Sequence, residues 1–115
     1  MSAPIAGELQ ISNDVLADLA GYAALEVYGV VGMTTPSLKN GVAQILSKDK
    51  LRRGIQVASE GGIATVDLYV VVEHGTNITE VSHNLKARVR YVLESIAGVE
   101  VADVPVHVQG IKVRT

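Results

Sequence analysis

The 115-residue sequence contains no cysteine, no tryptophan and no phenylalanine. Without cysteine, the chain can form no disulfide, no thiolate metal site and no cysteine nucleophile. Its aromatic residues are all tyrosines, so few side chains are available to stack on nucleic-acid bases. They are Tyr22, Tyr28, Tyr69 and Tyr91.

Basic charge and long apolar runs are also scarce. The formal net charge of −2 argues against a dedicated duplex-DNA binder, because neutralising phosphates drives that affinity. The longest strongly apolar run, Leu68 to Val72, is too short to span a bilayer, and the first residues lack the features of a signal peptide. We therefore expect one cytoplasmic domain over residues 1–115 with no transmembrane segment. Any membrane association would come through a partner or the surface.

The periodicity of apolar residues predicts an α+β fold in the order β-α-(short α)-β-β-α-β. We expect a two-layer sandwich with the helices on one face of a mainly antiparallel sheet. Ser12 and Asn77 are the predicted N-caps of the two long helices, and Gly29 and Gly98 follow their predicted ends. In chain order the predicted elements are an edge strand at 7–11, a helix over 13–28, a short helix within 36–47, strands at 55–59 and 63–73, a helix from 78 to 97, and one or two strands within 99–113.

The helix predicted over 13–28 is apolar on nearly all sides. Its core stripe comprises Val15, Leu16, Leu19, Ala20, Ala23 and Val27. A second face comprises Ala17, Gly21, Ala24, Leu25 and Tyr28. Such a helix needs burial on two sides, which either another element of the chain or another subunit could supply. Gly21 costs a helix about 1 kcal/mol relative to alanine, so we expect a close neighbour there. We predict that this second face mediates self-association.

Two other segments suggest ligands. The basic residues Lys48, Lys50, Arg52 and Arg53 cluster together and predict a contact with an anionic surface such as acidic lipid headgroups. Gly29–Gly32 is a Gly-x-x-Gly ahead of a β-β-α order, as in KH-type domains, which clamp an RNA backbone at that loop. Both middle residues here are valine, whereas such loops usually present a basic or polar residue. A KH-like single-stranded RNA-binding module, using Gly29–Gly32 and Lys48–Arg53, is the alternative function.

Motifs for catalysis and metal binding are weak. Glu80 and His83 have the Glu-x-x-His spacing of di-metal sites in helical bundles, but those sites need two such motifs and two further glutamates. The sequence has no Gly-x-Ser-x-Gly elbow and no phosphate-binding glycine loop. We expect no enzyme, no metal and no cofactor.

Two segments resemble the alkaline-shock and general-stress envelope proteins of Gram-positive bacteria. Residues 18–33 read Asp-Leu-Ala-Gly-Tyr-Ala-Ala-Leu-Glu-Val-Tyr-Gly-Val-Val-Gly-Met. They resemble that family's alanine-rich helix followed by Glu-Val-x-Gly-Val-x-Gly-Met. Residues 67–75 are similar to its central Asp-Leu-Tyr-hydrophobic-Glu-Tyr-Gly segment, with His74 in place of the common tyrosine. The resemblance covers about residues 7–113.

This resemblance implies a function and contributes no catalytic residue. It implies a non-enzymatic, self-associating scaffold or adaptor linked to cell-envelope stress, found near the membrane through a membrane-anchored partner protein. The expected state is a homo-oligomer, with a filament as the form that unclosed head-to-tail contacts produce.

Overall fold

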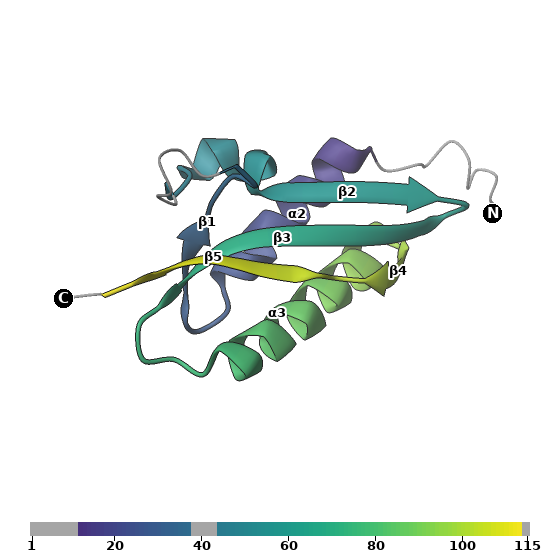
Figure 1. Ribbon diagram of the computed structural model, residues 1–115. Coiled ribbons are helices and arrows are strands. Elements are labelled where there is room, and N and C mark those ends of the chain that lie inside the picture. The colour runs from purple at the N-terminus through teal and green to yellow at the C-terminus, as the bar shows by residue number, and fades with distance from the viewer. Residues whose placement is uncertain (1–11, 38–43, 114–115) are drawn as a thin grey trace.

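The fold is built around one long strand, β3 (Ile63–Glu73), which has partners along both of its edges. On one edge, β2 (Ile55–Glu60) and β1 (Val30–Met33) pair with β3 antiparallel. On the other edge, β4 (Glu100–Asp103) and β5 (Val106–Lys112) pair with it in parallel. The result is a mixed sheet of five strands (Figure 1). The computed structural model describes residues 12–37 and 44–113.

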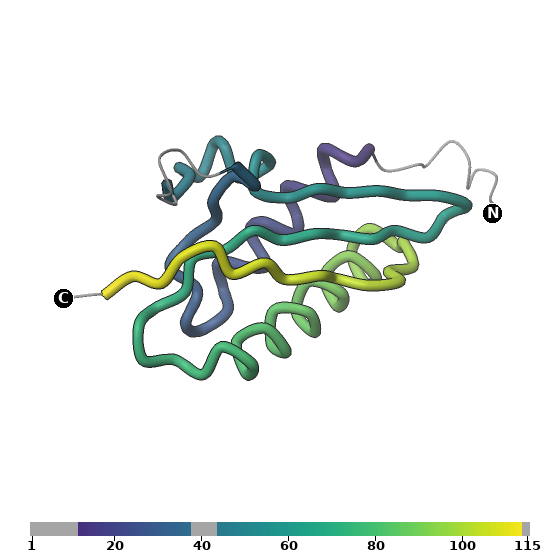
Figure 2. The backbone as a smooth tube through the Cα atoms, viewed as in Figure 1, coloured from purple at the N-terminus to yellow at the C-terminus, as the bar shows by residue number. Residues whose placement is uncertain are grey.

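Both long helices, α2 (Asn13–Leu25) and α3 (Ile78–Val92), cover the same face of the sheet (Figure 1). A π-helical turn, η2 (Leu93–Ala97), continues α3, and a 3-10 helix, η1 (Lys48–Gly54), leads into β2. Figure 2 shows how the chain leaves β3, runs back along α3 and returns beside β3. A parallel pairing requires such a crossover. The predicted α+β class, with the helices on one face of the sheet, is confirmed.

The local signals at the helix starts are confirmed. The Ser12 hydroxyl accepts a hydrogen bond from the amide of Val15 at 3.2 Å, and the Asn77 side chain accepts one from the amide of Glu80 at 3.0 Å. The two N-caps therefore satisfy amides that a helix leaves without internal partners.

The first helix ends earlier than predicted, at Leu25 instead of Tyr28. The amides of Glu26 and Val27 bond to carbonyls only three residues back, which tightens the chain into turns. Gly29, at a φ of 96°, then redirects it. The chain continues as β1, a strand that the predicted order of elements does not contain. β1 was not predicted because its four residues are too few to show the alternation of apolar and polar side chains that indicates a strand.

Two predicted elements lie wholly or largely outside the residues that the structure describes. The edge strand expected at 7–11 lies outside the described residues. The short helix expected within 36–47 lies largely outside them, and residues 44–47, which are described, are not helical.

The core lies between the helices and the sheet. Alternate residues of β3 face the helices and are almost completely buried: Ala64, Val66, Leu68, Val70 and Val72. The stripe of α3 that faces them consists of Val81, Leu85, Val89 and Val92, followed by Leu93. Val15, which was predicted to lie in the core, is instead exposed, and so are Ile78 and Ile96. Each of the three lies within the first or last turn of its helical segment.

Thr34, directly after β1, is fully buried, yet its hydroxyl has no hydrogen-bond partner among the described residues. Its amide donates to the carbonyl of Tyr69 at 2.9 Å, so the backbone is satisfied and only the side chain is not. A buried polar group without a partner costs about 1–3 kcal/mol. We expect Thr34→Val to raise the free energy of unfolding by about 1 kcal/mol, measured by urea denaturation. Thr65→Val, at a partly exposed position of β3, is the control. A destabilised Thr34→Val would show that the hydroxyl is bonded.

Candidate interaction surfaces

The second face of α2 is mostly covered by the chain itself. Ala17, Gly21 and Ala24 are buried, and α2 packs against η1, β2 and α3. A Cβ on Gly21 would lie 3.1 Å from Leu51 Cβ and 3.1 Å from Ile55 Cδ1. The close neighbour inferred from Gly21 therefore exists, but it belongs to the same chain.

The predicted self-association face is accordingly wrong for Ala17, Gly21 and Ala24, because these residues have no surface to offer. Leu25 is partly buried against the core. Only Tyr28, 83% exposed, remains fully available to another molecule. If the chain self-associates, it must do so mainly through another surface.

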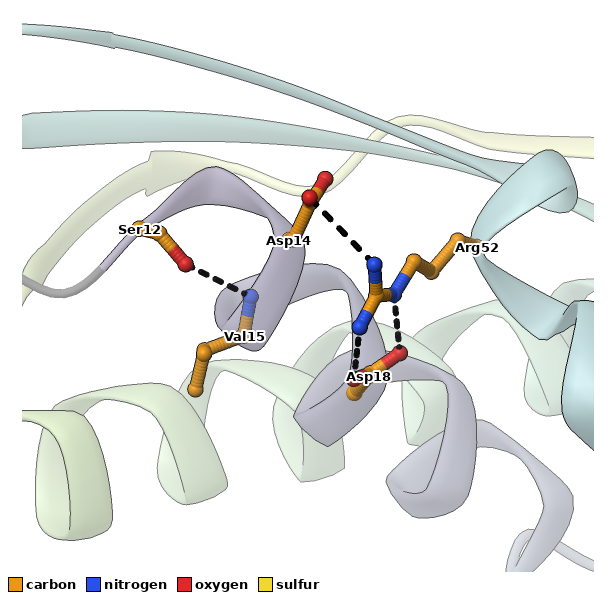
Figure 3. Close-up of polar contacts among 5 residues, drawn as sticks. All are labelled: Ser12, Asp14, Val15, Asp18 and Arg52. Atoms are coloured by element: carbon orange, nitrogen blue, oxygen red, sulfur yellow. Dashed lines mark hydrogen bonds and ion pairs between the residues drawn. The ribbon is translucent and has the colours of Figure 1, made fainter.

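The basic segment forms η1, whose apolar residue Leu51 is buried beside α2. Arg52 is engaged by two acids of α2. Its Nε and Nη2 donate to the Asp18 carboxylate at 2.8 and 2.9 Å, and its Nη1 lies 3.3 Å from Asp14 Oδ2 (Figure 3). Lys48, Lys50 and Arg53 are exposed and make no ion pair within the described part of the chain. The predicted anion contact therefore rests on three of its four bases.

The pairing with Arg52 makes the stability of this corner depend on pH. The hydrogen bond from Arg52 holds the pKa of Asp18 below its ordinary value of 3.8. A lowered pKa in the folded state stabilises the fold above the unfolded pKa. That stabilisation is lost as the pH falls through the lowered value.

We expect Asp18→Asn to be less stable than the parent chain at neutral pH and the difference to vanish as the pH falls through the lowered pKa of Asp18. Urea denaturation at a series of pH values measures this difference. Glu60→Gln, which removes one exposed charge from the end of β2, is the control. A difference that persists unchanged at the lowest pH would contradict the assigned ion pair.

Gly29–Gly32 is not a loop between helices. Val30 and Gly32 lie in β1, opposite Val72 and Val71 of β3. A Cβ on Gly32 would lie 2.6 Å from Ile45 Cγ2, so this backbone is covered and cannot clamp a phosphate. Gly29–Gly32 is therefore not a KH-type loop, and nothing in the described part of the chain supports RNA binding.

The face of the sheet opposite the helices carries a cluster of polar and aromatic side chains that was not predicted from the sequence. The rings of Tyr69 on β3 and His107 on β5 are stacked, with centroids 4.4 Å apart and planes 12° apart. His107 Nε2 lies 3.0 Å from Asp67 Oδ2, and the Tyr69 hydroxyl donates to Gln56 Oε1 at 3.4 Å. Three strands thus contribute to one polar and aromatic row.

The sequence contains only half of the signal for this row. His107 alternates with Val106 and Val108, and Asp67 and Tyr69 alternate with core residues of β3, so both sets are assignable to the outer face. Their contact depends on the parallel register that places Tyr69 opposite His107. That register is set by a crossover through α3, which no local pattern reveals.

The two ends of this outer face differ. At one end, Gln109 Nε2 donates to the carbonyls of Thr35 and Pro36 at 2.8 and 2.9 Å, and Val71 is buried although it lies on the outer face. Gln109 is the extra residue of a bulge, because Val108 pairs with Val70 and Gly110 with Val71. At the other end a shallow depression lies beside the β2–β3 turn, lined by Ala58, Ser59, Glu60, Ile63 and Thr65.

The described residues offer neither a metal cluster nor a membrane span. Over 12–37 and 44–113, no three His, Asp or Glu side chains are grouped closely enough to hold a metal ion. Glu80 and His83 are both exposed on α3. No helix in the same ranges combines the length and the apolarity that crossing a bilayer requires.

Comparison with known proteins gives consistent matches along nearly the whole chain. The profile of the alkaline-shock protein 23 family, described as having a cell envelope-related function, matches residues 2–113. The uncharacterized protein YloU of Bacillus subtilis is 42% identical over 108 residues, which cover 93% of this chain and 90% of YloU. The uncharacterized protein Spy1614 of Streptococcus pyogenes is 40% identical, with 93% of this chain and 89% of Spy1614 covered. No solved structure matches significantly.

Proposed function

The chain belongs to the alkaline-shock protein 23 family, whose function is cell envelope-related, and from this premise we propose that it is a non-enzymatic scaffold or adaptor that associates with itself. In this proposal it lies in the cytoplasm and reaches the membrane through a membrane-anchored partner protein. The proposal extends the family assignment by a biochemical role, a location and a link to envelope stress.

The observation that carries the proposal is the row of Gln56, Asp67, Tyr69 and His107 on the outer face of the sheet. Both described long helices lie on the other face. The row is held in place by ring stacking and hydrogen bonds. Ordered side chains lose little conformational entropy when a partner binds. Tyrosine is also enriched at protein interfaces. A pre-ordered surface of this kind suits an adaptor better than a reaction centre.

The exposed bases of η1 support a secondary contact near the membrane. Lys48, Lys50 and Arg53 would each contribute about 1 kcal/mol of attraction to an acidic membrane surface. Three such contacts give weak binding, and Asp49 opposes them. In the proposal they help to orient the chain, and the partner protein supplies the attachment.

The test is the mass of the purified chain, measured by light scattering over a wide range of concentration. We expect a mass that rises above the 12.1 kDa of one chain as the concentration increases. We expect the double variant Tyr69→Ser, Gln56→Lys to remain folded and to have a lower measured mass than the parent chain at the same concentration. Tyr91→Ser, which removes an exposed tyrosine from the helical layer, is the matched control and should keep it. A parent chain that stays at 12.1 kDa at every concentration would refute self-association.

A further inference from the structure

The outer edge of β5 differs from the other edges of the sheet. The amide of Leu46 donates to the carbonyl of Met33 at the edge of β1. Asn13 Nδ2 donates to the carbonyl of Val57 at the edge of β2. At β4, Arg90 donates to the carbonyl of Ala102. Within the described residues, no comparable bond reaches the outer edge of β5.

The part of β5 ahead of its bulge lacks the lysine or acidic side chains that commonly protect an exposed edge, and Lys112 lies beyond the bulge at Gln109. Natural edge strands commonly carry lysine, other charged residues or proline, which prevent pairing with another chain. Residues 104–110 read Val-Pro-Val-His-Val-Gln-Gly and contain no lysine, arginine or acid. The carbonyl of Pro105 accepts from the amide of Leu68 at 2.9 Å, so this residue faces β3 and does not block the outer edge.

Alternation along the strand shows which peptide groups point outward. The carbonyls of Pro105 and Lys112 both bond to amides of the β3 segment, namely those of Leu68 and His74. Backbone groups of successive strand residues point to opposite edges. The N–H and C=O groups of Val106 and Val108 therefore point away from β3. The bulge at Gln109 then interrupts the regular alternation.

We propose that two copies of this chain pair through β5, antiparallel, about a two-fold axis that passes at His107. The proposal rests on the proposed self-association and names its surface. In this register Val106 pairs with the partner's Val108, and Val108 with the partner's Val106. Each such pair exchanges both of its backbone hydrogen bonds. Centring the axis on Val106 would place Val108 opposite the partner's Val104, which lies outside β5. Centring it on Val108 would place Val106 opposite the partner's Gly110, past the bulge.

The same register continues the row on the outer face. His107 would lie opposite the partner's His107 as a non-hydrogen-bonded pair, in which side chains approach most closely. One face of the His107 ring is already stacked on the Tyr69 ring, with the two ring centroids 4.4 Å apart. The other face of the His107 ring is then free to stack on the ring of the partner's His107, which gives four rings in a row across a continuous sheet. This self-complementarity is what favours a second copy over an unrelated extended peptide.

Single cysteines test the register, because the chain has no cysteine of its own and any disulfide must join two chains. In the proposed dimer, the two Cα atoms at position 107 lie about 4.5 Å apart, within the range of a disulfide. At position 109 the separation grows by four residues of strand, to about 13 Å, which is too far. We expect His107→Cys to be converted almost completely to a disulfide-linked dimer under mild oxidation. Gln109→Cys, on the same strand, and Gln56→Cys, on the other outer strand, should remain mostly uncrosslinked.

A second pair of variants tests the contact between the two His107 rings without altering the fold. His107→Tyr keeps a ring on Tyr69 and should keep the dimer. His107→Lys places a positive charge beside Asp67 and sets two ammonium groups opposite each other, and we expect loss of the dimer with unchanged circular dichroism. Equal crosslinking at 107, 109 and 56, or a His107→Lys chain that still dimerises, would overturn the proposed pairing. Association without crosslinking at 107 would refute this surface alone, whereas a monomeric parent chain would also refute the proposed function.

Discussion

Leu85→Ala is expected to lower the free energy of unfolding by roughly 2–5 kcal/mol, the range for truncating a buried leucine. Leu85 has no exposed surface and lies in the middle of the core stripe of α3, within the same core as Leu16 of α2 and Leu68 of β3. Removing three carbons there loses contacts with both layers, and the cavity cannot fill without moving a helix. Most domains of this size have a free energy of unfolding of about 5–15 kcal/mol, so one such truncation takes a large share of it.

Urea denaturation followed by circular dichroism measures this loss. The matched control is Ile96→Ala, because Ile96 lies at the end of the same helical segment but is 68% exposed. We expect the control to change stability by less than about 0.5 kcal/mol, as is usual at surfaces. Equal effects of the two substitutions would mean that the face of α3 that packs on the sheet is wrongly assigned.

Gly21→Leu is expected to destabilise the fold by about 1–3 kcal/mol or more, through overpacking. A Cβ at this position already lies 3.1 Å from both Leu51 Cβ and Ile55 Cδ1. The remaining three carbons of leucine would have to displace η1 or β2 from α2. The gain in helix propensity on replacing glycine, about 1 kcal/mol, offsets only part of this cost.

The measurements for Gly21→Leu are thermal unfolding and the oligomeric mass. If Gly21 contacted another subunit, the variant would remain as stable as the parent chain and would only lose mass. The structure predicts the reverse, with a lower unfolding temperature whether or not the chain associates. Tyr22→Leu, which places the same side chain on the exposed side of the same turn, is the control and should leave stability nearly unchanged.

Features that depend on neighbouring residues in the sequence are predictable from it. The caps at Ser12 and Asn77 and the strands predicted at 55–59 and 63–73 are all present in the structure as expected. Each depends on hydrogen bonds or side-chain directions within a few residues, which are governed by local backbone geometry. The family resemblance, carried by two such segments, is likewise confirmed.

The contacts between segments far apart in the sequence could not be predicted without the three-dimensional fold. An apolar face on α2 requires a neighbour, but the requirement does not say whether η1, β2 or a second subunit supplies it. The hydrophobic effect is non-directional and is satisfied equally by any apolar surface. Leu51 and Ile55 meet it within the chain.

The outer face of the sheet shows the same division between local and distant information. The alternation of Tyr69 and His107 with core residues can be read from the sequence, because a strand turns successive side chains to opposite faces. Their contact across β3 and β5 needed the parallel register, which the crossover through α3 and the bulge at Gln109 decide together. A parallel pairing leaves no tight turn whose length and residues would fix the register locally. The tertiary fold therefore determines the surface on which association is proposed.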